Sequence, residues 1–318
     1  MAEMEPGGEK ENWERGVIEK LARTALDEQR KSRNWGIVFK SLTFIYLFAL
    51  LFIAAGWLGG REPLPGDHTA LVELSGVISA DSHANADVIS QGLQDAFENK
   101  GTKGVILRIN SPGGSPVQAG TINTEIHRLR QKHPDIPLYA VVEDICASGG
   151  YYVAVAADQI YVDRASIVGS IGVLMDGFGF TGTMEKLGVE RRLLTAGENK
   201  GFLDPFSPMN ASQREYAQKM LGEIHQQFID VVRKGRGKRL KEGPDTYSGL
   251  VWTGQRSIEL GLADALGSVD YVARDVIKAE KIIDFTPREN IAERFAKRFG
   301  AAMGDALFHT GGSASRVR

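Results

Sequence analysis

The chain has 318 residues, of which 42% are hydrophobic and 25% charged, and this composition excludes wholesale disorder and a collagen-like or disulfide-dense scaffold. The formal net charge of -2 gives no electrostatic reason to expect nucleic acid as a partner. With one cysteine, Cys146, the chain can build neither an intrachain disulfide nor a cysteine-rich zinc site.

Residues 1–40 are rich in Glu, Lys and Arg, which predicts a disordered or loosely helical tail. Residues 41–60 contain no charged residue, and a helix of that length spans about 30 Å of hydrocarbon. Bulky apolar residues on every side of this run argue against a buried helix of a soluble domain. We therefore predict one transmembrane helix over 41–60. A cleaved signal peptide is the alternative, although the preceding tail is longer than a usual charged leader.

The charges beside the apolar run predict its orientation. Four basic residues precede the run and one follows it closely: Arg30, Lys31, Arg33 and Lys40, then Arg61. Lys and Arg are enriched on the cytoplasmic side of membrane helices. The N-terminus is therefore expected in the cytoplasm, and everything after Gly60 is expected on the other side of the membrane.

The rest of the chain predicts an α/β domain over residues 68–285. Residues 61–67 contain two prolines and a glycine, typical of a short extended linker. Apolar runs then alternate with helical stretches, which predicts parallel strands joined by right-handed crossovers, with functional loops at the strand ends. Strands are expected near 70–74, 104–109 and 137–142, and helices near 86–98, 117–132 and 212–233. Residues 286–318 predict an amphipathic helix and a flexible tail, for packing against another subunit or, as the alternative, for membrane-surface contact.

Two glycine-rich segments follow strands of this domain, at residues 110–114 (NSPGG) and 146–152 (CASGGYY). Ser148 precedes two glycines at the expected start of a helix, where free backbone N–H groups favour developing negative charge. The glycines of the first segment allow a second backbone N–H to approach the same place. The pair predicts a nucleophile beside an oxyanion hole, and two ordinary tight turns are the alternative.

A serine nucleophile needs a base, and none of the six histidines has a persuasive context. His225 flanks the apolar face of the helix near 212–233, which favours a satisfied core histidine. Cys146 also replaces the first glycine of a G-x-S-x-G elbow, so a Ser-His-Asp triad is poorly supported. A lysine can act instead when burial disfavours its charged form. Lys200 is the best placed, before Phe202 and Phe206, although a surface lysine is its ordinary interpretation.

Four motifs in series carry a family resemblance: NSPGG at 110–114, CASGGYY at 146–152, SIVGSIGV at 166–173 and GENKG at 197–201. With the N-terminal apolar segment, they resemble the signal peptide peptidase A family of membrane-anchored bacterial Ser-Lys peptidases, over about residues 68–280. The resemblance implies a fold similar to the caseinolytic protease and crotonase superfamily, with stacked β-β-α units. It also implies the compact single-domain form of the family, which assembles as a ring-like homo-oligomer.

The resemblance further implies a role for each candidate residue. Ser148 would be the nucleophile and Lys200 the general base, with Ser170 orienting the lysine and Gly114 and Gly149 as oxyanion donors. No metal or organic cofactor is expected. The implied function is a serine endopeptidase of the bacterial inner membrane that hydrolyses peptides, cleaved signal peptides first and misfolded exported proteins second.

Two other functions stay open at this point. A crotonase-like acyl-CoA enzyme would share the fold, but an exported domain has little access to CoA. A catalytically silent oligomeric membrane scaffold is the second alternative, and the presence of both Ser148 and Lys200 argues against it. The basic run from Arg233 to Lys241 is expected to be a solvated helix end, with contact to anionic lipid as the alternative.

Overall fold

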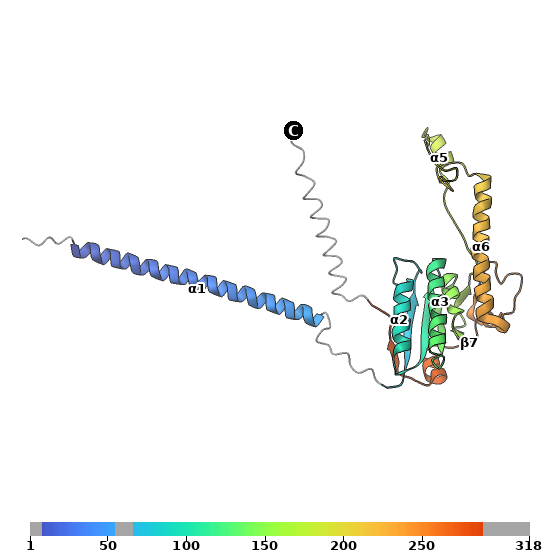
Figure 1. The fold of residues 1–318 in the computed structure, drawn as a ribbon, viewed down its shortest axis with the longest axis horizontal. Coiled ribbons are helices and arrows are strands. Elements are labelled where there is room, and N and C mark those ends of the chain that lie inside the picture. Colours follow the sequence, from blue (N-terminus) through green and yellow to red (C-terminus); the bar gives the residue numbers. More distant parts are fainter. Residues whose placement is uncertain (1–7, 55–65, 289–318) are drawn as a thin grey trace, which may run out of the picture. The chain divides into compact units, whose positions relative to one another are not determined.

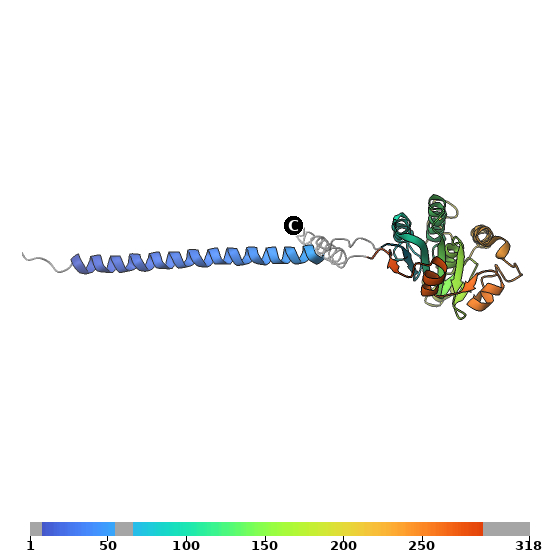
Figure 2. The ribbon, with the colours of Figure 1, turned by 90° about the horizontal axis from the view of Figure 1, so that it is seen from below.

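The computed structural model describes residues 8–54 and 66–288. These residues fall into two separate units, of which Leu64–Pro287 is the larger compact one (Figures 1 and 2). The domain predicted over 68–285 lies within that unit. Residues 61–65 of the predicted linker and all but the first three residues of the predicted C-terminal segment 286–318 lie outside the described residues.

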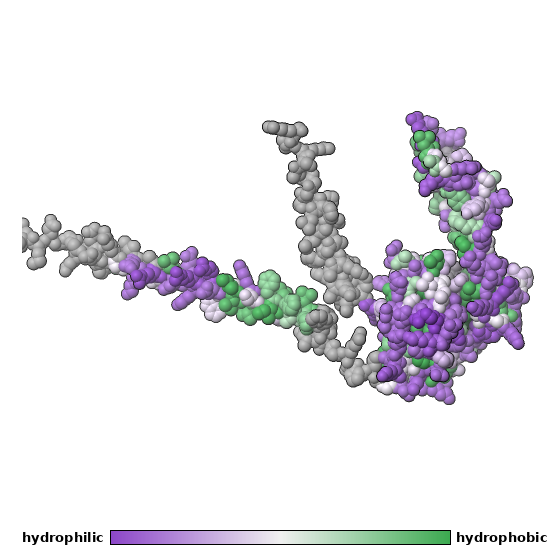
Figure 3. Space-filling view, viewed as in Figure 1, coloured by the Kyte–Doolittle hydropathy of each residue, from purple (hydrophilic) through white to green (hydrophobic). Residues whose placement is uncertain are grey.

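Helix α1 spans Gly8–Ala54 as one continuous helix of 47 residues. Residues 8–40, expected to be disordered or loosely helical, are therefore helical in the structure. The segment contains no proline, and Glu19 pairs with Arg23 one turn later at 2.7 Å. The same helix carries the apolar segment from Ser41 onward, which gathers hydrophobic side chains along one end of α1 (Figure 3). Among the described residues, this one helix is long and apolar enough to cross a membrane.

The compact unit is built on a mixed sheet with the strand order β6-β5-β3-β2-β1-β8. Strand β4 lies beside the first half of β3 and also pairs with β7, whereas β5 lies beside the second half of β3. All pairs are parallel except β5 with β6. The strands are β1 His68–Ser75, β2 Thr102–Ser111, β3 Leu138–Ala147, β4 Gln159–Val162, β5 Ile167–Gly169, β6 Val251–Thr253, β7 Ala265–Leu266 and β8 Ile282–Asp284. The predicted α/β class with parallel strands is confirmed.

Alternating side chains of the central strands face two different apolar clusters. In β1, Val72 and Leu74 belong to the large core cluster, whereas Leu71 belongs to a smaller cluster on the other face. In β2, Leu107 belongs to the large cluster and Ile106 to the smaller one. This period of two is the pattern of a sheet covered on both faces.

Helices α2, α3, α4 and α6 contribute to the large cluster, whereas the second cluster includes residues of the short helical turn η2. The helices of the unit are α2 Ala86–Glu98, α3 Pro116–Lys132, α4 Gly149–Ala154, α5 Thr181–Lys186, α6 Ala211–Arg236, η1 Gly237–Arg239, α7 Gly254–Glu259, α8 Val269–Tyr271 and η2 Val272–Ile277. Local signals fix their starts: the Asn85 side chain accepts a hydrogen bond from Val88 N at 2.8 Å, and Ser115 precedes Pro116 in the first turn of α3.

A long segment, residues 172–210, connects β5 to α6, and we call this segment the arm. Helix α5 belongs to the arm and lies at the end of α6 that points away from the sheet (Figure 1). The arm exposes large apolar side chains to an unusual extent: Leu174, Phe178, Leu187, Leu194 and Met209. Such a concentration of exposed apolar side chains is typical of a surface that contacts a partner.

Candidate active site

Ser148 lies between the end of β3 and the start of α4, in an unusual backbone conformation. Its φ and ψ are 51° and -121°, values that cost a residue other than glycine about 1–3 kcal/mol. Hydrogen bonds hold this conformation: Ser148 N–H donates to Gly169 O at 2.8 Å, and Ser148 O accepts from Tyr152 N at 2.9 Å. The side chain makes no capping hydrogen bond to the helix. The backbone of Ser148 is therefore held in place, and its hydroxyl is not used to cap α4.

The loop of residues 113–115 packs directly against Ser148. A Cβ atom on Gly113 would lie 2.6 Å from Gly149 N and 2.7 Å from Ser148 Cβ, and one on Gly149 would lie 3.2 Å from Gly114 N. The φ angles of Gly113 and Gly114, 99° and 147°, also favour glycine. Ile78 O accepts a hydrogen bond from Ser115 N at 2.8 Å and so anchors the loop. The backbone nitrogens of Gly114 and Gly149 thus both lie where this loop packs against Ser148.

A cavity of about 530 Å³ opens over these groups. Ser148, Ser170, Gly114 and Gly149 all line it. Ser170 has a positive φ of 52°, and its N–H donates to Leu250 O at 2.7 Å. Most of the remaining wall is apolar: Ala119, Tyr152, Val173, Leu174, Ile224 and Phe228. The structure therefore brings four of the five predicted site residues together, beside an apolar space.

Lys200 is the predicted site residue that one chain does not bring to this cavity. It lies exposed on the arm, where its backbone N–H donates to Gly197 O at 3.1 Å. Lys200 is absent from the described lining of the cavity. The two phenylalanines expected to enclose it have other neighbours, because Phe202 contacts the ring of Tyr216 and Phe206 stacks on Phe180. Within one chain, the expected enclosure of Lys200 is therefore wrong.

Neither His225 nor Cys146 offers a replacement. His225 is half-buried, and its Nε2 lies 3.2 Å from Ile171 O. A carbonyl oxygen only accepts, so this nitrogen carries the proton and cannot take one from Ser148. Cys146 is fully buried, and burial raises the pKa of its thiol, so it stays protonated. No histidine is among the described residues that line the cavity.

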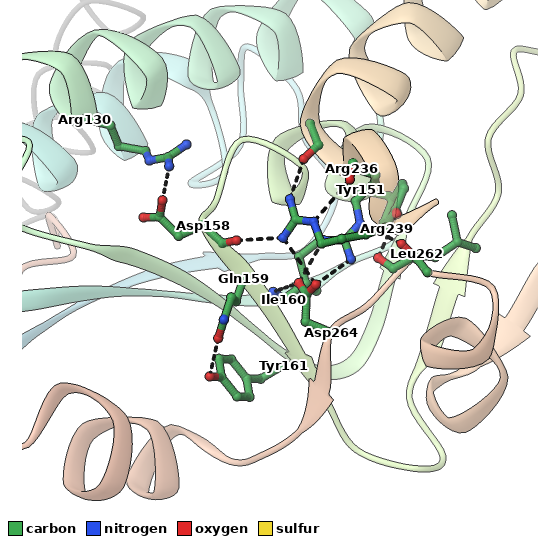
Figure 4. A network of polar contacts seen from close by, with 12 residues as sticks. Arg130, Tyr151, Asp158, Gln159, Ile160, Tyr161, Arg236, Arg239, Leu262 and Asp264 are labelled. Carbon is green, nitrogen blue, oxygen red and sulfur yellow. Dashed lines mark hydrogen bonds and ion pairs between the residues drawn. The ribbon is translucent and has the colours of Figure 1, made fainter. Parts of the chain in front are cut away.

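A buried polar network includes Tyr151 of α4 (Figure 4). Tyr151 Oη donates to Leu262 O at 2.8 Å, and Arg236 Nε donates to the neighbouring Gly261 O at 2.8 Å. The Arg236 guanidinium also makes two hydrogen bonds of 2.8 Å to Asp264, although its side chain is only 1% exposed. Asp264 in turn accepts from Ile160 N at 2.7 Å. The network ties α4, α6 and β4 together, and α4 begins directly after Ser148.

This network adds to the interpretation of the basic run from 233 to 241, most of whose basic residues are exposed, as expected of a solvated helix end. Arg233 pairs with Glu242 at 2.8 Å, and Arg236 and Arg239 both pair with Asp264. All three arginines therefore serve contacts within the chain, but Arg233 and Arg239 stay exposed, as expected of a solvated helix end, and Arg236 alone among them is buried. Their spacing of three residues places them near one another on the helix, and this was the available signal in the sequence.

Burial alone would raise the pKa of Asp264, but hydrogen bonds and charge from Arg236, with further help from Ile160 N and Arg239, outweigh it. The pKa of Asp264 is held below its ordinary value. The carboxylate therefore stays charged at neutral pH, and its negative charge balances the positive charge of the buried Arg236 guanidinium.

Comparison with known proteins identifies the family. The model of Peptidase family S49 matches residues 130–282. The chain is 47% identical over 177 residues to a Na(+)/H(+) antiporter NhaA of Brucella melitensis, a match that covers 56% of this chain and 24% of that protein. It is 29% identical to a candidate signal peptide peptidase SppA of Enterococcus faecium, over 67% of this chain and 61% of that protein. It is also 30% identical to a candidate protease of Synechocystis sp., over 63% of this chain and 69% of that protein.

The chain thus spans a quarter of the antiporter and less than two thirds of the Enterococcus protein. Its α/β sheet, its single apolar N-terminal helix and the family match confirm the fold class that the motifs implied. The serine beside paired backbone donors agrees with a serine peptidase. The chain belongs to peptidase family S49, as its resemblance to signal peptide peptidase A predicted.

Proposed function

We propose that this protein is a membrane-bound serine endopeptidase with Ser148 as its nucleophile. The conformation of Ser148, strained and placed beside the N–H groups of Gly114 and Gly149, is the observation that supports this most. Ser148 Oγ attacks the carbonyl carbon of a peptide bond, and the two N–H groups donate to the oxyanion that forms. Donors of this kind contribute about 3–4 kcal/mol each to the stability of the transition state.

Lys200 is the base in this proposal, and a neighbouring copy of the chain supplies it. Its exposure on the arm, together with the exposed apolar side chains there, supports an assembly in which one arm packs against the next subunit. The neutral amine takes the proton of Ser148 and returns it to the leaving amine, and water then hydrolyses the acyl-enzyme by the same steps. Ser170, on the wall of the same cavity, orients the incoming lysine. The assembly is a ring-like homo-oligomer.

The proposed substrates are peptides with apolar residues near the cleaved bond, because apolar side chains wall most of the cavity. Cleaved signal peptides fit this description, and misfolded exported proteins are a second class. The apolar part of α1 anchors the enzyme in the bacterial inner membrane, with the N-terminus in the cytoplasm and the peptidase domain outside it. This orientation rests on the basic residues that precede the apolar segment.

The test uses the full-length chain in detergent and an apolar peptide with a fluorescent reporter. Ser148→Ala should abolish hydrolysis and labelling by a serine-reactive phosphonate. Ser248→Ala is the matched control, because Ser248 lines the same cavity but its hydroxyl donates to Asp245 O at 2.7 Å. Labelling and turnover that persist in Ser148→Ala, with normal sedimentation, would reject the nucleophile. A wild-type chain that neither cleaves nor labels would favour the silent scaffold.

A further inference from the structure

A second cavity, of about 870 Å³, adjoins the one over Ser148. Residues of α2, α3 and α6 form its walls. Four residues line both cavities: Pro116, Tyr152, Ile224 and Gln227. The two cavities therefore meet at these four residues, beside α3. We call this second cavity the α3 groove.

The walls of the two cavities differ in their chemistry. The charged residues among the described lining of the α3 groove are Asp87 and Glu125, both acidic. Asp87 is exposed at the first turn of α2, whereas Glu125 accepts hydrogen bonds from Gln94 and Arg128. Because Glu125 forms an ion pair with Arg128, the negative charge that the groove presents to solvent is the exposed carboxylate of Asp87, in contrast to the apolar wall beside Ser148.

Hydroxyl groups add further acceptors along α3. Thr121 Oγ1 donates to Val117 O at 3.0 Å, and Thr124 Oγ1 donates to Gly120 O at 2.8 Å. Each hydroxyl has thereby used its proton and keeps lone pairs that can accept. Thr121, Thr124 and Asp87 thus offer acceptors along one side of the α3 groove, which suits ligand groups that donate, such as ammonium, guanidinium and amide N–H groups.

The length of the groove determines how many residues of a peptide it can hold. The lining of α3 runs from Pro116 to Glu125, and nine helical steps of 1.5 Å amount to about 14 Å. An extended peptide covers that length with about four residues. The groove thus has room for a short segment of chain beyond the part held over Ser148.

We propose that the α3 groove binds the polar, positively charged flank of a peptide whose apolar part occupies the cavity over Ser148. This rests on the proposed function and specifies its substrates further. Secretory signal peptides have this order, because a positively charged segment adjoins their apolar segment. The enzyme then reads two features of one peptide, an apolar stretch at the cleaved bond and a basic group several residues away.

The first test blocks the groove. A Cβ atom on Gly120 meets nothing within 4 Å, so Gly120→Trp fills the groove without straining α3. Gly222→Trp is the matched control, since Gly222 also lies on a helix facing open space and lines neither cavity. We expect Gly120→Trp to lower the ratio of kcat/KM for a long peptide with a Lys-rich flank over that for its short apolar core by about tenfold. Gly222→Trp should leave that ratio as in the wild type.

The second test reverses the charge. Asp87→Lys should lower the preference for a Lys-containing flank over a Glu-containing flank by about tenfold at low salt, because the groove then repels the basic flank. Asp95→Lys is the control on the same helix, since Asp95 bonds to Gln91 and does not line the groove. Equal flank preferences in the wild type and Asp87→Lys would overturn the proposal.

Two further outcomes keep this proposal separate from the proposed catalytic function. If no peptide is cleaved, the catalytic proposal fails, and binding of the labelled long peptide to the Ser148→Ala chain is measured by fluorescence anisotropy instead. Binding that Gly120→Trp weakens about tenfold still supports the groove, and unchanged or absent binding overturns it. If Gly120→Trp changes the sedimentation of the oligomer and not the peptide preference, the groove is a contact between copies and the proposal is wrong.

Discussion

A mixture of two inactive variants tests whether Lys200 acts on the serine of another subunit. Ser148→Ala chains keep the lysine and Lys200→Ala chains keep the serine, and each variant alone should be inactive. In a head-to-tail ring assembled at random from equal amounts, half of the sites hold the serine and half of those face the lysine. The mixture should therefore recover about a quarter of the wild-type activity. A lysine that serves its own serine would give none.

The assay mixes the variants under conditions that dissociate the oligomer and then restores assembly. Two tags of different size confirm that both chains enter the same particles. A serine-reactive phosphonate should label the Lys200→Ala chain alone, because that chain carries Ser148. Lys200→Arg in place of Lys200→Ala should give the same result, since a guanidinium stays protonated and cannot accept the serine proton. Mixed particles without activity or label would refute the shared site.

Three other predictions concern the fold, the loop and the topology. Asp264→Asn leaves Arg236 buried without a compensating charge and should lower the free energy of unfolding by about 3 kcal/mol or more in urea. Because the pKa of Asp264 is lowered by folding, its contribution is present above about pH 4 and is lost below it; an equally steep acid loss in the variant would contradict this. Gly114→Ala should abolish turnover, as its Cβ would overlap Ile78 O; a normal kcat would exclude Gly114 as a donor. Residues 1–40 should resist external protease in intact cells, and their cleavage would reverse the orientation.

Local signals explain why the elements of the domain could be predicted. The helix expected over 86–98 coincides with α2, which begins after the Asn85 cap. The helix near 212–233 extends to Arg236, where Gly237 with a φ of 51° follows it. The helical state of residues 8–40 could not be predicted in the same way. Their charged composition resembles that of a disordered segment, whereas the structure has an unbroken helix there that includes the i,i+4 pair of Glu19 and Arg23.

The residues of the candidate site differ in how well the sequence could place them. Ser148 and Gly114 could be placed together because each follows a predicted parallel strand, and the carboxyl ends of such strands meet at one edge of a sheet. Ser170 was expected there only because the family resemblance implied it. Lys200 follows no strand, since it lies on the exposed arm. In the proposed assembly, the position of such a residue depends on which surface of the neighbouring copy the arm meets.

The buried network that holds α4 next to Ser148 could not be predicted from the sequence, for a related reason. Arg236 and Asp264 are 28 positions apart, and nothing in a run of basic residues indicates a buried carboxylate that far along the chain. Their pairing nevertheless bears on the active site, because a residue in a costly φ/ψ region persists only when its surroundings over-determine it. The hydrogen bonds of Tyr151 and Arg236 to adjacent carbonyl groups of 261–262 hold α4 in place. The same contacts that make Arg236 difficult to replace therefore help to keep Ser148 in the strained conformation from which the proposed reaction would start.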